Sequence, residues 1–283
     1  MRAVARIVGA IGAWFIALLI TIFGRRRRRA DVPWLEGPIG GAVIGDAPYR
    51  EVAEAEGLTV ERASRSGGLV PSWDALDGNG FDAARVHPLV RDFYEHTSEF
   101  DMDVWSKSYF PANIGLWLLV TTISRQVSQL EFPLSPLDTA HGMQSEIISM
   151  RRPDGSVRYT GWFRTVGPRV LYTGFYMVAQ VPGEASACVK VVFPMPRGNA
   201  TVILRPTNGT GGALELDTGG GAFGGAGFYR LRAKGDRVTV WKVRTLRERF
   251  RVYVDDAGTL RCDHSVRFLG LPVLTLHYKI YRR

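Results

Sequence analysis

The chain has 283 residues, of which 46% are hydrophobic and 22% are charged, so a mainly disordered protein is excluded. This length allows one large domain or two small ones with a sizeable core. The formal net charge of +9 is unevenly spread: residues 1–29 carry seven arginines and no acidic residue, and residues 229–283 carry 14 basic and 5 acidic side chains. The chain is therefore basic at its two ends and not throughout.

The first element in chain order is an uncharged, apolar segment between Arg6 and Arg25. As a helix, its 18 residues would span about 27 Å, which is near the hydrocarbon thickness of a bilayer. A cleavable signal would be followed by small residues, whereas this segment is followed by a basic run. Residues 1–29 are therefore predicted to be a retained transmembrane anchor with a polybasic stop. The membrane-contacting residues predicted in it are Trp14, Phe15, Arg25, Arg26, Arg27, Arg28 and Arg29.

The basic residues on the two sides of the apolar segment predict its orientation. Five arginines follow the segment, whereas two arginines and the terminal amine precede it. Because positive charge stays on the cytoplasmic side, the body that follows is expected in the cytoplasm. The predicted location is the cell membrane, with a single pass and a cytoplasmic C-terminal domain.

Residues 30–84 are rich in glycine and proline and are predicted to be a juxtamembrane connector. One short helix is expected at Pro48–Glu56, with Asp46 as its N-cap and Gly57 at its end. The connector contains large apolar side chains such as Trp73, which need burial. We therefore expect it to pack against the body of the protein.

The globular domain is predicted over residues 85–283, and helices are expected between 85 and 130. His87–Thr97 has the amphipathic pattern of a helix. The stretch Ser108–Ser124 carries no charge and leaves a second membrane span open as an alternative. A buried core helix, or a helix in the membrane interface, is favoured for this stretch because it is short and contains polar residues.

From residue 143 the hydrophobic pattern has a period of two, which predicts a β meander over residues 143–283. About ten strands are joined by short turns with the sequences RRPDGS, VPGE, AKGD and DDAG, which favours antiparallel pairing. A sheet of this size tends to curl or to close. The predicted fold class is α+β and mostly antiparallel β. It comprises an N-terminal transmembrane helix, a few helices, and a C-terminal β-barrel or strongly curved antiparallel sheet.

Several predicted strands, notably Val170–Val181, are apolar on both faces. Such a strand fits a barrel wrapped by the helices, or the wall of a ligand cavity. Aromatic side chains are dense in this part of the chain, and an arginine among them could meet an acidic headgroup. The ligand-binding residues predicted here are Trp162, Arg164, Tyr172, Phe175 and Tyr176.

The densest polar cluster is SPLDTAHGMQSE, in which Asp138 and His141 are three residues apart. A helical turn would bring these two side chains together, and such a pair can act as a catalytic acid and base. The favoured alternative is a capped loop before the first strand, because no nucleophile motif accompanies the pair. The two cysteines, Cys188 and Cys262, lie in no CxxC or Cys/His cluster, so no metal site is predicted.

The leading interpretation is a membrane-anchored, non-catalytic module that binds a membrane lipid or another hydrophobic small molecule. The alternatives are an enzyme that acts on a hydrophobic substrate through Asp138 and His141, and a membrane scaffold protein. The basic C-terminal third fits a membrane surface, or the polar outer face of a sheet paired with acidic residues. It contains no recognised nucleic-acid module, so no nucleic-acid partner is expected. No cofactor is expected, and the oligomeric state stays open.

Overall fold

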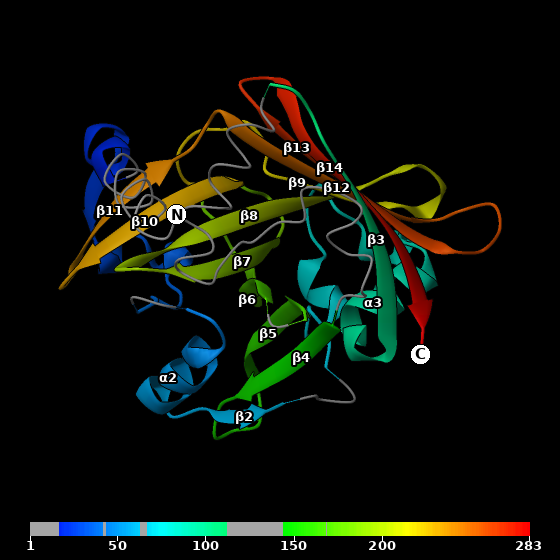
Figure 1. Cartoon of the computed structure of the whole chain (residues 1–283), viewed down its shortest axis with the longest axis horizontal. Coiled ribbons are helices and arrows are strands. Elements are labelled where there is room, and N and C mark those ends of the chain that lie inside the picture. Colours follow the sequence, from blue (N-terminus) through cyan, green and yellow to red (C-terminus); the bar gives the residue numbers. More distant parts are fainter. Residues whose placement is uncertain (1–16, 42–43, 63–66, 112–143, 168) are drawn as a thin grey trace.

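The computed structural model describes residues 17–41, 44–62, 67–111, 144–167 and 169–283. About half of these residues belong to one 14-stranded sheet, and two helices pack on it (Figure 1). The helices are α2 (Ala47–Glu56) and α3 (Pro88–Glu95). The strands are β1 (Arg25–Arg28), β2 (Thr59–Glu61), β3 (Phe100–Ser108), β4 (Gln144–Arg151), β5 (Val157–Val166), β6 (Arg169–Ala179), β7 (Cys188–Met195), β8 (Gly198–Asn208), β9 (Leu214–Asp217), β10 (Gly227–Lys234), β11 (Arg237–Lys242), β12 (Leu246–Val254), β13 (Leu260–Phe268) and β14 (Leu271–Arg282).

The main path of the sheet is β2-β4-β5-β6-β7-β8-β9-β12-β13-β14-β3, and its neighbouring strands are antiparallel. A branch leaves this path at β8, whose first half also pairs with β10, and β11 and β1 follow β10. The path ends at β2 on one side and at β3 on the other. The described sheet is therefore open. The mostly antiparallel β sheet predicted from the sequence is confirmed, and the closed form of it, a β-barrel, is wrong.

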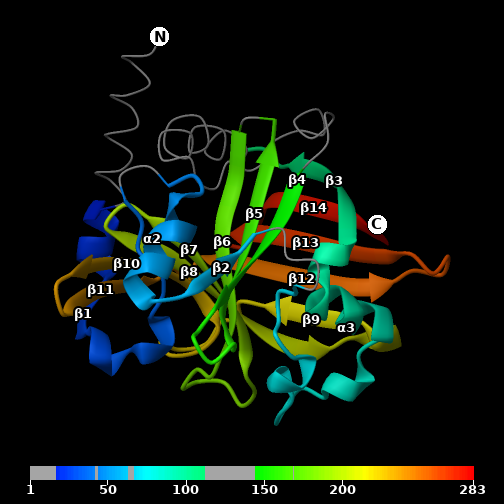
Figure 2. The same ribbon diagram turned by 90° about the horizontal axis from the view of Figure 1, so that it is seen from below.

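The curvature brings two parts of the sheet face to face. Figure 2 shows β4, β5 and β6 running steeply across β12, β13 and β14. Register shifts in the β4–β5, β5–β6 and β13–β14 pairs provide the local bends that such a fold needs. The largest hydrophobic core lies between the two parts, and it includes Trp162 from β5, Met102 from β3 and Ile280 from β14.

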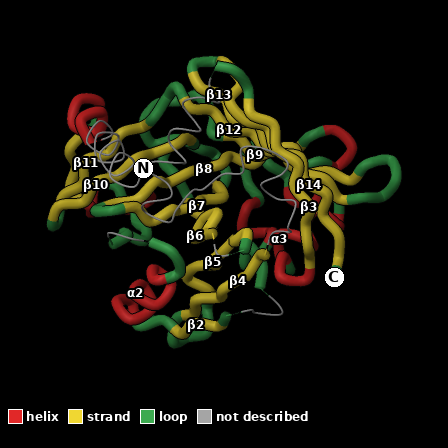
Figure 3. The backbone as a smooth tube through the Cα atoms, viewed as in Figure 1, coloured by secondary structure: helices red, strands yellow, loops and turns green. Residues whose placement is uncertain are grey.

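The connector 30–84 packs on the sheet, as its apolar residues predict. Leu35, Leu69 and Trp73 are all buried. Helix α2 covers the outer face of β5 and β6, opposite the main core, and Figure 3 shows it outside the strands. Gly161 of β5 leaves room for the ring of Tyr49 from α2, because an added Cβ would collide with that ring.

The predicted helix boundaries are close to the observed ones. Helix α2 ends at Gly57, which adopts the left-handed conformation with φ 65°. Asp46 occupies its N-cap position, but its carboxylate binds Arg62 at 3.0 Å instead of capping the helix. Helix α3 begins with Pro88, and the ring of His87 accepts a hydrogen bond from the backbone of Leu89.

Three strands were not predicted from the sequence. Strand β3 pairs along its whole length with β14, and β2 pairs with β4. Strand β1 consists of four of the five consecutive arginines and pairs with β11. The arginine run therefore enters the sheet, and all four of its β1 side chains are exposed.

The predicted anchor lies largely outside the described residues, including Trp14 and Phe15. Residues 17–23 are helical and lead into β1 through Gly24. Within the described residues, no helix has both the length and the apolar composition needed to cross a bilayer. The stretch Ser108–Ser124 is described only up to residue 111, and its favoured helix is not tested.

Candidate functional site

The predicted ligand-binding residues lie on β5 and β6, and strand alternation decides which of them meet. Trp162 and Arg164 are two apart on β5 and share one face. Arg164 is opposite Tyr172 of β6, and Tyr176 of β6 is opposite Thr160 of β5. Trp162, Arg164, Tyr172 and Tyr176 therefore share the inner face, toward the main core. This set is called the inner aromatic face below.

Phe175 does not belong to the inner aromatic face. It is opposite Gly161 and points to the other side of the sheet, where it packs against Tyr49 and Tyr159. The sequence prediction placed Phe175 and Tyr176 in one ligand-binding set, although adjacent residues of a strand point to opposite faces. Phe175 helps to hold α2 on the sheet.

Arg164 is the centre of the inner aromatic face. Its guanidinium carbon lies 4.2 Å from the ring centre of Trp162, and 5.5 Å from the ring centres of Tyr172 and Tyr278. Tyr278 belongs to β14, across the core. The Nη2 atom of Arg164 contacts the Sδ atom of Met102 on β3. The arginine thus joins the two parts of the curved sheet.

The charge of Arg164 is almost fully removed from water, because the residue is 4% exposed. Among the described residues, no carboxylate lies within 4.0 Å of its guanidinium nitrogens, and its Nε atom has no hydrogen-bond partner. Burial raises the pKa of Tyr172, Tyr176 and Tyr278, so these hydroxyls remain neutral and supply no counter-charge. The site therefore holds a buried positive charge that the described residues do not neutralise.

Such an arrangement is costly for the folded chain. Removing an ion from water carries an effective penalty of several kcal/mol when no partner is present. The aromatic rings recover about 2 kcal/mol of this through cation–π attraction. Methionine sulfur is a weak hydrogen-bond acceptor on a flexible side chain, so Met102 is a poor substitute for an anion and is easily displaced. The geometry therefore suits a negatively charged oxygen at the position that Met102 now contacts.

Met102 and Tyr278 were missed as members of this site. Both lie on strands far from β5 in sequence, and only the folding of the sheet brings them to Arg164. The alternation in FDMDVWSKS does place Phe100 and Met102 on one face, which was a usable signal for an inward-facing strand.

The proposed catalytic pair, Asp138 and His141, lies outside the described residues. Three histidines in the described part each contact one carboxylate: His96 with Asp92 at 2.9 Å, His264 with Glu248 at 3.3 Å, and His277 with Asp263 at 2.7 Å. Within the described chain, none of these three is hydrogen-bonded to a serine, threonine or cysteine. Nor do the described His, Cys, Asp and Glu residues form a group of three or more that could hold a metal ion.

Four of the basic side chains in the C-terminal third form ion pairs with acidic residues: Arg249, Arg261, Arg282 and Arg283. Arg249 contacts Glu215 at 2.5 Å, and Arg261 contacts Asp255 at 2.8 Å. Arg282 contacts Glu99, which directly precedes β3, at 2.5 Å. Arg283 contacts Asp101 of β3 at 2.9 Å. This part of the sheet is therefore paired with acidic residues only in part.

Two broad depressions lie on the surface, and neither contains Arg164. One, of about 620 Å³, lies beside α2 and is lined by Tyr49 and Arg62 among others. The other, of about 490 Å³, lies on the outer face of β3, β13 and β14, where the tilted rings of Trp105 and His277 have centres 5.5 Å apart. The inner aromatic face is packed with side chains and is separate from both.

A comparison with curated proteins finds a distant relative, the uncharacterized membrane protein YndJ of Bacillus subtilis (strain 168). The two sequences are 25% identical over 229 residues, which make up 79% of this chain and 40% of the relative. The chain therefore spans less than half of the length of this relative. No protein-family model and no solved structure matches the chain.

Proposed function

We propose that this chain is a membrane-associated, non-catalytic binding module whose inner aromatic face holds the acidic group of an amphipathic ligand. One observation carries the proposal: Arg164 is buried without a carboxylate partner among the described residues. Buried charges in proteins are normally paired, and an unpaired one points to a partner that binds there. The membrane association is supported by the apolar N-terminal sequence and by the similarity to a membrane protein.

The chemistry of the site defines the ligand class. A guanidinium group presents parallel N–H donors that match a carboxylate or a phosphate. The rings of Trp162, Tyr172 and Tyr176 offer apolar surface to a hydrocarbon chain next to that group. A neutral lipid would leave the charge of Arg164 unpaired. The proposed ligand is therefore an apolar chain that ends in a carboxylate or a phosphate.

The membrane scaffold is the second candidate, because side chains fill the space between the two parts of the sheet. A scaffold accounts for the packed core, but it gives no reason to keep a buried charge. The alternative of an enzyme has no support among the described residues, because Asp138 and His141, its predicted catalytic pair, lie outside them.

The proposal is tested by equilibrium binding to the full chain in neutral phosphatidylcholine nanodiscs, with empty nanodiscs as the blank. The probes are decanoate, decyl phosphate, decanol and acetate. Decanoate or decyl phosphate should bind at least tenfold more tightly than decanol, and acetate should bind weakly because it lacks the apolar chain. Equal affinity for decanoate and decanol would contradict the proposal.

A matched pair of variants assigns the binding to this site. Arg164→Met should remove the preference for the acidic probes. Arg158→Met is the control, because Arg158 lies on the same strand and over the ring of Tyr159 at 4.6 Å, but is paired with the carboxylate of Glu56 from α2. It should leave the preference unchanged. Loss of the preference in both variants would place the binding elsewhere.

A further inference from the structure

The edge of the sheet formed by β1, β11 and β10 carries a cluster of five exposed basic side chains. In this antiparallel register Arg26 lies beside Thr239 and Arg232, and Arg28 lies beside Arg237 and Lys234. Directly opposite residues share a face, so the five basic side chains form two rows on one side of the sheet. This set, Arg26, Arg28, Arg232, Lys234 and Arg237, is called the basic edge below, and all five residues are exposed.

Two acidic residues at this edge, Asp31 and Asp236, do not balance its five basic residues. Within the described chain, one member of the basic edge forms an ion pair: Arg28 contacts Asp31 at 3.6 Å. The basic residues of β12, β13 and β14 are different, because several of them contact carboxylates of neighbouring strands. The basic edge therefore carries a local excess of positive charge, and it lies at the opposite end of the sheet from β3 (Figure 1).

Apolar and aromatic side chains border the basic edge on the side of the N-terminal segment. Phe23 stacks on Trp241 of β11 with ring centres 5.9 Å apart. Ile22 is 61% exposed and Phe23 is 59% exposed, although both are large apolar residues. Gly24 joins the helical residues 17–23 to β1, and it packs directly against the side chain of Thr239. Exposed aromatic residues next to arginines are typical of the boundary between a bilayer and water.

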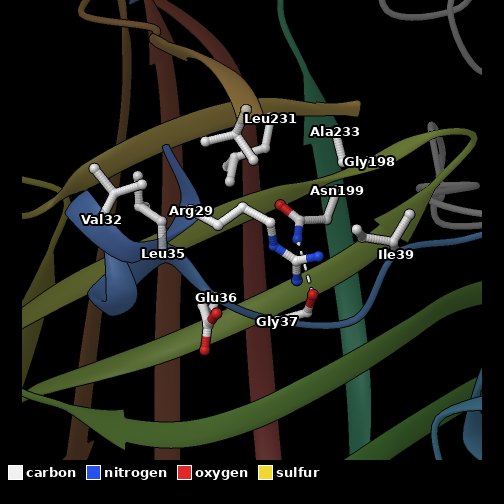
Figure 4. Close-up of a pocket in the computed structure, with 11 residues that line it drawn as sticks. Arg29, Val32, Leu35, Glu36, Gly37, Ile39, Gly198, Asn199, Leu231 and Ala233 are labelled. Atoms are coloured by element: carbon white, nitrogen blue, oxygen red, sulfur yellow. Dashed lines mark hydrogen bonds between the residues drawn. The ribbon is translucent and has the colours of Figure 1, made fainter. Parts of the chain in front are cut away.

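Backbone hydrogen bonds hold β1, which follows the apolar N-terminal segment directly in the sequence, in the sheet. All four residues of β1 are paired with β11, and the backbone N–H of Arg29 donates to Asp236 at 2.9 Å. Figure 4 shows that the side chain of Arg29 turns inward along a small cavity of about 20 Å³, toward Gly37 and Asn199. The last arginine of the run is thus part of the fold, whereas Arg26 and Arg28 point to solvent.

We propose that the basic edge binds the anionic headgroups of a bilayer and holds the sheet at a fixed orientation on the membrane surface. This inference rests on the proposed membrane association, and it adds residues of β10 and β11 that are 200 positions away from the arginine run. Each basic side chain near an anionic leaflet adds attraction that salt weakens. The bordering Phe23 and Trp241 place the same edge at the level of the headgroups.

The test measures energy transfer from a fluorophore on the β10–β11 turn to a headgroup-labelled lipid. The fluorophore is attached to the full chain through Asp236→Cys, since Asp236 is exposed and the native Cys188 and Cys262 are buried. The chain is placed in nanodiscs of phosphatidylcholine alone or with phosphatidylglycerol. Transfer should be more efficient in the anionic nanodiscs, and added salt should lower it to the value in the neutral ones.

Two triple variants complete the test. Arg232→Glu, Lys234→Glu and Arg237→Glu together should abolish the gain in the anionic nanodiscs. The control, Arg50→Glu, Arg85→Glu and Arg152→Glu, changes the same charge at exposed sites away from the edge and should keep the gain.

Each result separates the inference from the proposed function. Equal transfer in both nanodiscs, or equal loss in both triple variants, would overturn the inference alone. Failure of the wild-type chain to enter either nanodisc would overturn the membrane association itself. Retention of the chain on RNA that the basic-edge variant loses, with transfer unchanged, would assign the edge to nucleic acid and overturn the inference.

Discussion

Replacing Arg164 by methionine should stabilise the ligand-free chain. The substitution removes the guanidinium charge and keeps an unbranched stem of similar length in the same position. Its neighbours are the rings of Trp162 and Tyr278 and the side chain of Met102, all of which accept an apolar group. The expected effect is unusual, because most substitutions of buried residues destabilise a protein.

The size of the effect follows from two opposing contributions. The buried, unpaired guanidinium costs several kcal/mol. Its cation–π contact with Trp162 at 4.2 Å returns about 2 kcal/mol, and the two tyrosine rings at 5.5 Å return less. Methionine keeps a favourable sulfur–aromatic contact of about 1 kcal/mol. We therefore expect the free energy of unfolding to rise by about 1–3 kcal/mol in Arg164→Met.

Urea unfolding followed by tryptophan fluorescence, in one detergent for all variants, measures this change. Arg158→Met is the control, because its half-exposed ion pair with Glu56 contributes at most about 1 kcal/mol. Decanoate should stabilise the wild-type chain and leave Arg164→Met unaffected. A ligand-free Arg164→Met chain that is less stable than wild type by about 2 kcal/mol or more would refute the reasoning, since breaking a paired buried charge has that result.

Three further outcomes follow from the packing. Burial lowers the pKa of Lys190 to about 8, so above that pH the folded chain binds fewer protons than the unfolded chain. The free energy of unfolding should therefore rise from about pH 8 to about pH 10. This rise should be smaller in Lys190→Met. Gly161→Ala should lower the melting temperature through a loss of about 1–3 kcal/mol, whereas Gly174→Ala, with its nearest contact at 3.3 Å, should cost less. Cys188 and Cys262 should resist a thiol reagent until unfolding exposes two free thiols.

The strands from β5 to β14 were predictable because each shows a period of two between turns with clear chemistry. Strand β1 was not, because four consecutive arginines have no alternation and the backbone pairing with β11 is a tertiary event. The choice between a closed and an open sheet was also beyond the sequence. It depends on register shifts such as the one between Arg164 and Thr165, which no residue pattern revealed.

The site was predictable only in part. Strand alternation placed Trp162 and Arg164 together, and the aromatic content pointed to β6. The lack of a carboxylate near Arg164 among the described residues could not be read from the sequence, because acidic residues are common along the chain and only the fold decides which of them come close. The contacts with Met102 and Tyr278 depend in the same way on how the sheet bends.

The most direct test of the account is the nuclear magnetic resonance signal of the Arg164 Nε–H group during a titration with decanoate. The signal is assigned by its absence in Arg164→Met. We predict that decanoate shifts this signal, because the Nε atom gains the hydrogen-bond partner that it lacks among the described residues, and that decanol leaves it unchanged. A signal that ignores decanoate, or that responds equally to decanol, would contradict the claim that Arg164 receives an acidic ligand.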